Sequence, residues 1–173
     1  PAVQKVREAA ARTTADLGDG VNRFELQSKG VGQVGLDLTT GENNDEVLIG
    51  LLLPTVQKVR EAADTSPPEP DVDLNLTTNG GDDDVLIGLL LPAVQKVREA
   101  AARITGDMGD GDDHIELRAI GVSAVDTVLA LGSGDDDASI SLLLPAVQKV
   151  RESAARTNVD TGPGADHVRL RIR

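Results

Sequence analysis

Six short turns carry the residue types in this chain that could do chemistry. Each follows the pattern Gly-x-Gly-x-Asp-x-apolar, complete or with substitutions, and its aspartate position holds Asn22, Asp45, Asp83, Asp113, Asp136 or Asp166. Glycines leave main-chain carbonyl oxygens open to approach, and Ca²⁺ binds about six to eight hard oxygens of carbonyls and carboxylates. The turns therefore predict Ca²⁺ as a cofactor. The candidate ligands are Asp113, Asp136 and Asp166 in complete turns, and Asp45 and Asp83 in altered ones.

A second interpretation of these turns requires no metal. Gly, Asn and Asp are the residues that tight turns need, because they tolerate left-handed backbone or hydrogen-bond to their own main chain. His114 and His167 each directly follow a candidate aspartate. We interpret these histidines as solvated residues at the start of strands, not as ligands.

The turns resemble the nonapeptide repeats of the repeats-in-toxin (RTX-like) β-rolls. In that family glycines permit the turn, aspartates and turn carbonyls bind Ca²⁺, and the apolar residue points into the roll. The resemblance implies calcium binding by the five aspartates. Here the family's first glycine is replaced in every turn, by Leu17, Thr40, Thr78, Met108, Leu131 or Thr161. Successive turns within a long unit are 23 residues apart (136 − 113), so folding must bring distant turns together to complete a site.

The composition excludes several classes of function. The 173 residues include no Cys, Trp or Tyr, one Phe and one Met, and the net charge is −12. Without Cys there are no disulfides and no thiolate metal sites, and the core must consist of Leu, Val, Ile and Ala. The negative charge should repel nucleic acid and anionic membranes. No apolar run approaches the roughly 18 residues that span a bilayer. We therefore expect neither nucleic-acid binding nor a membrane span.

A repeated phrase divides the chain into units. Leu-Leu-Leu-Pro-Ala-Val-Gln-Lys-Val-Arg-Glu-Ala-Ala occupies residues 89–101 and recurs with one change at 51–63 and 142–154, and without its leucines from Pro1. Repeats of this length stack copies of one supersecondary unit. We therefore predict a single repeat array over residues 1–173, with units 1–53, 54–91, 92–144 and an incomplete 145–173. Because the chain begins inside the phrase, we expect it to be a piece or a processed form of a longer protein.

The phrase itself predicts a helix. In residues 93–103, Val94, Val97 and Ala101 form one apolar stripe at helical spacing. Glu99 precedes Arg103 by four residues, the order that favours a helical ion pair.

Two starts of this helix stay open. Either the leucines end a strand and the proline opens the helix, or the helix begins before the leucines, capped by Gly50, Gly88 or Ser141. We slightly favour the longer helix. The phrase is also similar to the N-terminal helix of bacterial prepilin-type, pilin-like proteins. That resemblance implies helicity and a bacterial origin, but not pilus assembly, because the cleavage site and the upstream apolar stretch of that family are missing.

Segments between the phrases predict strands. Residues 72–76, 114–118 and 168–172 alternate between polar and apolar side chains, and residues 125–131 and a segment from Ala138 continue the series. Such alternation indicates one buried and one solvated face. The expected fold is an α/β repeat protein, a solenoid-like stack of short strands with one helix per repeat.

No catalytic constellation accompanies these features. The sequence has no Ser-His-Asp spacing, phosphate loop or nucleotide fingerprint, so we expect no enzymatic activity. It favours a non-catalytic structural or cell-surface repeat segment, stiffened by Ca²⁺, in an extracellular location. Two alternatives stay open: a self-assembling subunit whose copies join head to tail into filaments, and a protein-binding module that presents one face of the solenoid.

Overall fold

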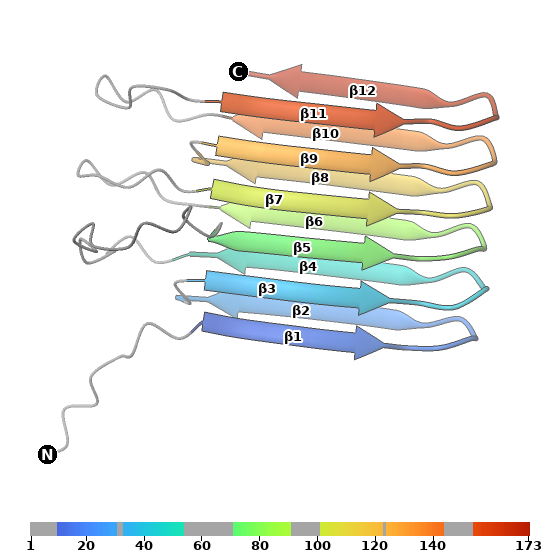
Figure 1. The fold of residues 1–173 in the computed structure, drawn as a ribbon, viewed down its shortest axis with the longest axis horizontal. Helices are drawn as coiled ribbons and strands as arrows, with labels where there is room; N and C mark the ends of the chain where they lie inside the picture. The colour runs from blue at the N-terminus through green and yellow to red at the C-terminus, as the bar shows by residue number, and fades with distance from the viewer. Residues whose placement is uncertain (1–9, 31–32, 54–70, 91–100, 123, 144–153) are drawn as a thin grey trace, which may run out of the picture.

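Two parallel β-sheets form the part of the molecule that the structure describes. The computed structural model describes residues 10–30, 33–53, 71–90, 101–122, 124–143 and 154–173. Within these residues every regular element is a strand, and the strands form two sheets of six. The odd-numbered strands make sheet A and the even-numbered strands make sheet B. The sheets lie face to face as two layers (Figure 1).

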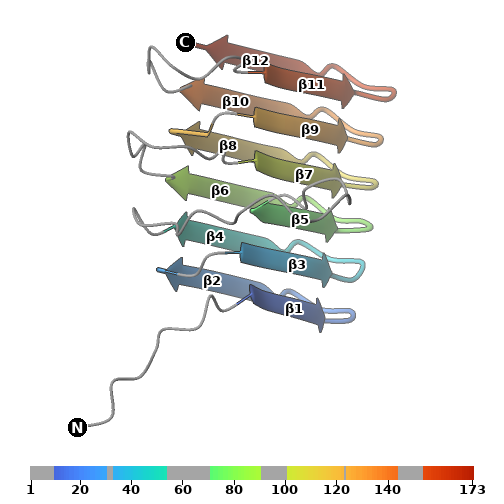
Figure 2. The ribbon, with the colours of Figure 1, turned by 60° about the vertical axis from the view of Figure 1, so that its left-hand side comes forward.

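Each strand of sheet A continues through a turn into a strand of sheet B. Sheet A consists of β1 Ala10–Asp16, β3 Gln33–Thr39, β5 Val72–Thr77, β7 Ala101–Asp107, β9 Ala124–Ala130 and β11 Ala154–Asp160. Sheet B consists of β2 Arg23–Lys29, β4 Glu46–Leu52, β6 Asp84–Leu90, β8 His114–Ile120, β10 Asp137–Leu143 and β12 His167–Ile172. One strand of each sheet and the turn between them form a coil, and the coils stack in chain order (Figure 2). The molecule is a repeat protein with a solenoid-like β architecture.

The two edges of the stack differ. At the turn edge, every turn from sheet A to sheet B has six residues, from 17–22 in the first coil to 161–166 in the last. At the connection edge, the chain returns to sheet A through segments of very different length. The register shows this, because Ala10 pairs with Gln33, 23 residues on, and Val34 pairs with Val72, 38 residues on. The differences in length therefore fall at the connection edge, and the register of the paired strands is unchanged on either side.

The core lies between the sheets. Alternate side chains of each strand point inward, as a period of two requires. Leu36, Leu74 and Ile104 form one inward row of sheet A and are at most 1% exposed. The corresponding row of sheet B contains Ile49, Ile87, Leu117 and Ile140. The expected core of Leu, Val, Ile and Ala is confirmed, with Met108 added near the turn edge.

The predicted helix in each repeat, and with it the α/β fold class, is wrong. The leucines end β4, β6 and β10, which excludes the longer helix. An Ala-Ala-Arg segment that begins at the end of the phrase opens β1, β7 and β11. Ala102, Ile104 and Gly106 point inward at every second residue, and β7 pairs with a parallel neighbour on each side. Pairing and burial outweigh helix propensity, which is only a weak preference. The middle of the phrase, at 2–9, 54–63, 93–100 and 146–153, lies outside the described residues.

The predicted strands are correct to within one or two residues. They correspond, in order, to β5 for residues 72–76, β8 for 114–118, β9 for 125–131 and β12 for 168–172. The segment predicted to begin at Ala138 corresponds to β10. The described part of residues 1–53, however, contains four strands and not three, because a strand also begins at the end of the phrase. Among the described residues, no helix is long and apolar enough to cross a membrane.

Candidate functional site

The five predicted ligands lie in one column at the turn edge. Each is the last residue of its turn, directly before a strand of sheet B, and the coils stack these positions on one another. We call Asp45, Asp83, Asp113, Asp136 and Asp166 the aspartate column. Asn22 holds the same position in the first coil. Folding therefore brings together turns that are distant in sequence, as the predicted calcium site requires.

One hydrogen bond, repeated at every junction, joins this column. The series begins at Asn22 and ends at Asp166. In each bond, a main-chain N–H donates to the Oδ1 of the equivalent residue one coil further on, and the N···O distances are 2.6–3.3 Å. Each carboxylate thus satisfies a main-chain donor that would otherwise be unpaired at the entrance to a strand. The bond fixes one oxygen of each carboxyl group and leaves the other available.

That second oxygen has no hydrogen-bond partner in the inner coils. The Oδ2 atoms of Asp45, Asp83, Asp113 and Asp136 are buried and accept no hydrogen bond from the described residues. Each of these residues is only 2–3% exposed. A buried polar atom without a partner costs about 1–3 kcal/mol, and more when it is charged. These four positions therefore favour a proton or a cation beside Oδ2.

The first coil shows what this position can accommodate. Asn22 uses its Nδ2 to donate to the carbonyl oxygens of Gly18, at 2.9 Å, and Gly20, at 2.8 Å. In the coil of Asp113 the equivalent carbonyls belong to Gly109 and Gly111. In an inner coil, the carboxylate oxygen Oδ2 therefore takes the place of the Nδ2 donor of Asn22. This difference explains why the inner aspartates favour the protonated or cation-bound form of the carboxyl group.

Burial raises the pKa of several members of the column. The pKa of Asp113 rises to about 7, chiefly because burial penalises its charge and further because Asp83 and Asp136 are negative. Burial is also the main cause that raises the pKa values of Asp83 and Asp136, again with help from neighbouring acids. The N–H bond to each carboxylate acts in the opposite direction, since it favours the charged form. Near neutral pH Asp113 is thus about half protonated.

Glycines allow the turns to stack this closely. Gly134 has a φ of 143°, and a Cβ there would lie 2.0 Å from the carbonyl oxygen of Gly111 in the neighbouring coil. No other residue fits without moving the backbone. Asn79, with a φ of 64°, shows that Asn can take one of the glycine positions. The close stacking places the carbonyl oxygen of one turn against the glycine of the next.

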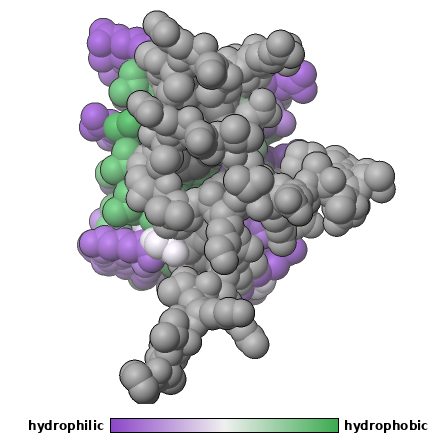
Figure 3. All heavy atoms as spheres, turned by 90° about the vertical axis from the view of Figure 1, so that its left-hand side faces the viewer, coloured by the Kyte–Doolittle hydropathy of each residue, from purple (hydrophilic) through white to green (hydrophobic). Residues whose placement is uncertain are grey.

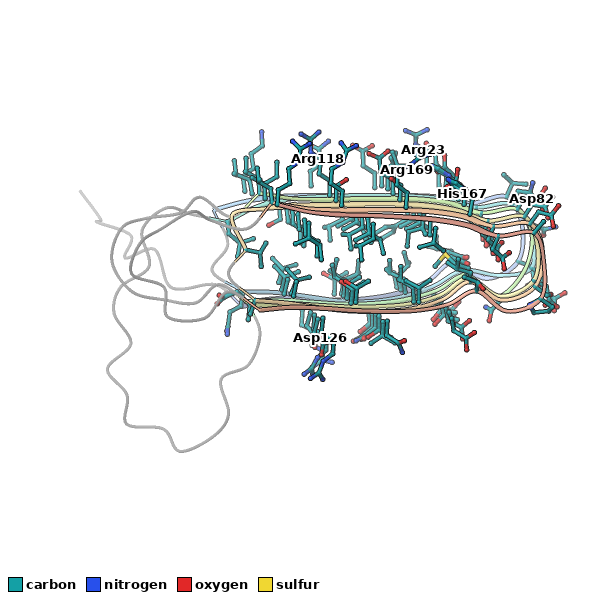
Figure 4. All side chains as sticks on the ribbon, turned by 90° about the horizontal axis from the view of Figure 1, so that it is seen from above. Arg23, Asp82, Arg118, Asp126, His167 and Arg169 are labelled. Atoms are coloured by element: carbon teal, nitrogen blue, oxygen red, sulfur yellow. The ribbon has the colours of Figure 1, made fainter. Side chains whose placement is uncertain are left out.

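A second acidic column runs beside the first and faces solvent. Asp82, Asp112 and Asp135, which we call the exposed column, each directly precede a member of the aspartate column. The N–H of Asp112 donates to Oδ1 of Asp82 at 3.0 Å, and that of Asp135 to Oδ1 of Asp112 at 2.8 Å. Asp82 is seen at the turn edge in Figure 4. The turn motif predicted the aspartate column but gave no role to the exposed column, for which the paired aspartates of the turns were the available signal.

The donor set decides which cation the turn edge could hold. Within the described ranges, no group of three or more His, Asp and Glu side chains is arranged to hold a metal. A cation would therefore need Oδ2 of the aspartate column together with turn carbonyl oxygens, a set of hard oxygens that suits Ca²⁺. His114 and His167 directly follow members of the column, but they are exposed first residues of β8 and β12, with β10 between these strands.

Comparisons of this chain with protein-family models, with curated proteins and with solved structures found no match. The RTX-like and prepilin-type resemblances rest on the turn and phrase motifs alone.

Proposed function

We propose that this chain is a non-catalytic structural segment of an extracellular or cell-surface protein, a β-solenoid spacer that Ca²⁺ stiffens along its turn edge. One observation carries the proposal: in four successive coils the aspartate column presents a buried Oδ2 without a hydrogen-bond partner. A spacer needs the same stabilising contact at every coil, and this column repeats its contact at every junction.

The chemistry of the column favours a hard divalent cation. Asp83, Asp113 and Asp136 would hold it through Oδ2, together with carbonyl oxygens of the glycine turns. Bound Ca²⁺ supplies positive charge that neutralises adjacent carboxylates and links successive turns. Oδ1 keeps its main-chain hydrogen bond in either state, so the column itself need not rearrange. The cation would replace the proton that the raised pKa values otherwise favour.

A structural role also agrees with how the other titratable groups are placed. A general acid or base must lie within hydrogen-bond reach of a reacting group, usually in a concave site. His114 and His167 instead stand on the outer face of sheet B, and His167 points into solvent in Figure 4. The carboxyl groups with raised pKa values each accept a hydrogen bond from the main chain of a repeated turn.

Thermal unfolding with and without divalent cations tests the proposal. Ca²⁺ at about 100 times its dissociation constant should stabilise the fold by about 2.7 kcal/mol per site, which raises the melting temperature by several degrees. The double variant Asp113→Asn, Asp136→Asn should lose most of this increase. The matched control is Asp112→Asn, Asp135→Asn, which removes the same charge from the exposed column and should keep the increase. Coincident melts in Ca²⁺ and Mg²⁺ would show that the turns do not bind calcium specifically.

Head-to-tail self-association is a second candidate function. Asn22 is the first donor of the hydrogen-bonded column and Asp166 the last acceptor. A second copy stacked beyond Asp166 would continue the column, because its Asn22 Oδ1 could accept the N–H of Asp166. The last strand would also gain burial, since Val168, Leu170 and Ile172 are 40–48% exposed.

The same junction would bring cationic side chains together, Arg156 of one copy beside Arg12 of the next. Association should therefore strengthen with ionic strength, because salt screens this repulsion. Electron microscopy at high protein concentration and high salt should show linear stacks. Dispersed particles under all salt and Ca²⁺ conditions would exclude self-assembly and leave the spacer function standing.

A further inference from the structure

A shallow apolar groove runs along the outer face of sheet B. It has a volume of about 730 Å³, and its floor is formed by β4 and β6. The outward side chains of these strands that line the groove are Leu48, Leu52, Leu86 and Leu90, with Leu52 and Leu90 exposed by 38% and 45%. Figure 3 shows a hydrophobic band on this side of the molecule, bordered above and below by hydrophilic residues. The outer face of a solvated strand normally carries polar residues, so this band is a departure from the pattern.

Two glycines deepen the middle of the groove. Gly50 and Gly88 are direct neighbours across β4 and β6. Neither has a positive φ, and a Cβ would approach other atoms no closer than 4.0 Å at Gly50 and 3.9 Å at Gly88. The coil itself therefore does not need glycine at either position, although glycine weakens a strand. A glycine in a strand often marks a place where another backbone approaches closely.

The width of the groove fits an α-helix. Its walls are β2 and β8, which lie three strand spacings apart in sheet B, or about 14 Å. An α-helix with its side chains is about 10–12 Å wide. The leucines at the two ends of the floor are four strand residues apart, about 13 Å, which matches the length of about nine helical residues. One apolar helical stripe can thus contact both ends of the floor.

Charged residues on the walls give the groove a direction. Glu25 on β2 and Glu116 on β8 flank the end nearer the turns. Lys29 lies on β2 at the opposite end, and Arg118 lies beside Gly88. Figure 4 shows Arg118 projecting outward from sheet B. Helices commonly carry acids in their first turn and bases in their last turn, because these charges complement the helix dipole.

We propose that this groove binds an amphipathic α-helix of a partner protein, antiparallel to β4 and β6. The apolar stripe of the helix covers Leu48, Leu52, Leu86 and Leu90 and approaches the sheet most closely over Gly50 and Gly88. Its acidic first turn lies beside Lys29, its middle passes Arg118, and its basic last turn lies beside Glu25 and Glu116.

A second copy of this chain fits the groove less well. Two such faces packed about an axis along the stack would bring the two Arg118 side chains together. Packing about an axis along the strands would instead place Glu25 over Glu116. In both arrangements the walls meet first and the hollow stays open, whereas close packing is what gives an interface its affinity.

Binding of a synthetic helix tests the proposal. The probe is a labelled peptide of about fourteen residues with leucines at i, i+3, i+4 and i+7, glutamates in its first turn and lysines in its last. Fluorescence anisotropy should show saturable binding to the whole chain. The double variant Gly50→Thr, Gly88→Thr should weaken binding at least about tenfold, because two new side chains block the closest approach. The control Gly35→Thr, on sheet A, should bind as the natural chain does, since a Cβ there also has room, 3.5 Å from Arg12.

Three further measurements decide the outcome. Both glycine variants should melt no lower than the natural chain, because Thr is a better strand former than Gly. A peptide with lysines first and glutamates last should bind more weakly, and equal binding would overturn the proposed orientation. Equal affinity for the natural chain and the Gly50→Thr, Gly88→Thr variant, or no saturable binding at millimolar peptide, would overturn the site. A concentration-dependent dimer that the same variant abolishes would assign the groove to a second copy.

Discussion

The aspartate column and the exposed column use the same residue type, in the same turns, for nearly the same hydrogen bond. In both, an aspartate Oδ1 accepts a main-chain N–H from a neighbouring coil, at 2.9 Å for Asp113 and 3.0 Å for Asp82. They differ in what surrounds the second oxygen. Oδ2 of Asp113 is buried without a partner, whereas Asp82 is exposed to water. Of two aspartates adjacent in the chain, one therefore only accepts a hydrogen bond within the turn edge, whereas the buried one also needs a proton or a cation.

The largest expected consequence is a dependence of stability on pH that comes from the aspartate column. The pKa of Asp113 is about 7 in the folded state, against 3.8 for an ordinary aspartate. Between these values the folded chain keeps a proton that the unfolded chain releases, so stability falls as the pH rises from about 4 to about 7. The shift in Asp113 alone corresponds to a loss on the order of 4 kcal/mol. Raised pKa values of Asp83 and Asp136 act in the same direction.

Urea unfolding at several pH values, in the presence of a chelator, measures this effect. The free energy of unfolding should be highest near pH 4 and should level off above about pH 7. A maximum above pH 7 without divalent cations would contradict the raised pKa values. Added Ca²⁺ should reduce the loss at high pH, because it takes the place of the released proton.

The second prediction compares the columns directly by removing one charge from each. Asp113→Asn should stabilise the chain at pH 8 without Ca²⁺ by about 2–3 kcal/mol, because the amide is neutral and can donate to turn carbonyls as Asn22 does. Asp112→Asn removes the same charge and should change stability by less than about 0.5 kcal/mol. Both variants keep an oxygen that can accept the main-chain N–H. If they stabilise the chain equally, the effect is reduced net repulsion and not burial.

The sequence predicted the repeated turns better than it predicted the elements between them. The spacing of Asp113, Asp136 and Asp166 within a fixed motif was enough to place them at equivalent positions, because tight turns depend on local residue types. The motif selected Asp113 and not Asp112, because Asp113 lies two residues before the inward Ile115. It did not show that Oδ2 of Asp113 is buried without a hydrogen-bond partner. Burial depends on the stacked neighbours, which a single sequence does not show.

The helix prediction failed for a related reason. Residues 101–103 have strong helix propensity, but they also fit the inward–outward alternation that continues through Ile104. A period of 3.6 and a period of two are hard to distinguish over so few residues. The parallel ladders with β5 and β9 decide the outcome, and they pair residues 23 or 30 positions away. Such long-range pairing is visible only in the folded chain.

The smallest predicted effect comes from the opposite substitution in the first coil, which introduces a carboxylate in place of an amide. Asn22→Asp should remove the two hydrogen bonds to the carbonyl oxygens of Gly18 and Gly20 and place a carboxylate oxygen beside them. We expect a loss of about 1 kcal/mol at pH 8 without Ca²⁺, less than for an inner coil, because Asn22 is only partly buried. If the aspartate column holds Ca²⁺, the variant adds one more ligand, so Ca²⁺ should restore the lost stability and raise the melting temperature of the variant more than that of the natural chain. A loss that is the same with and without Ca²⁺ would mean that Asn22 serves the turn only through its own hydrogen bonds. The first coil would then resemble the exposed column in its chemistry.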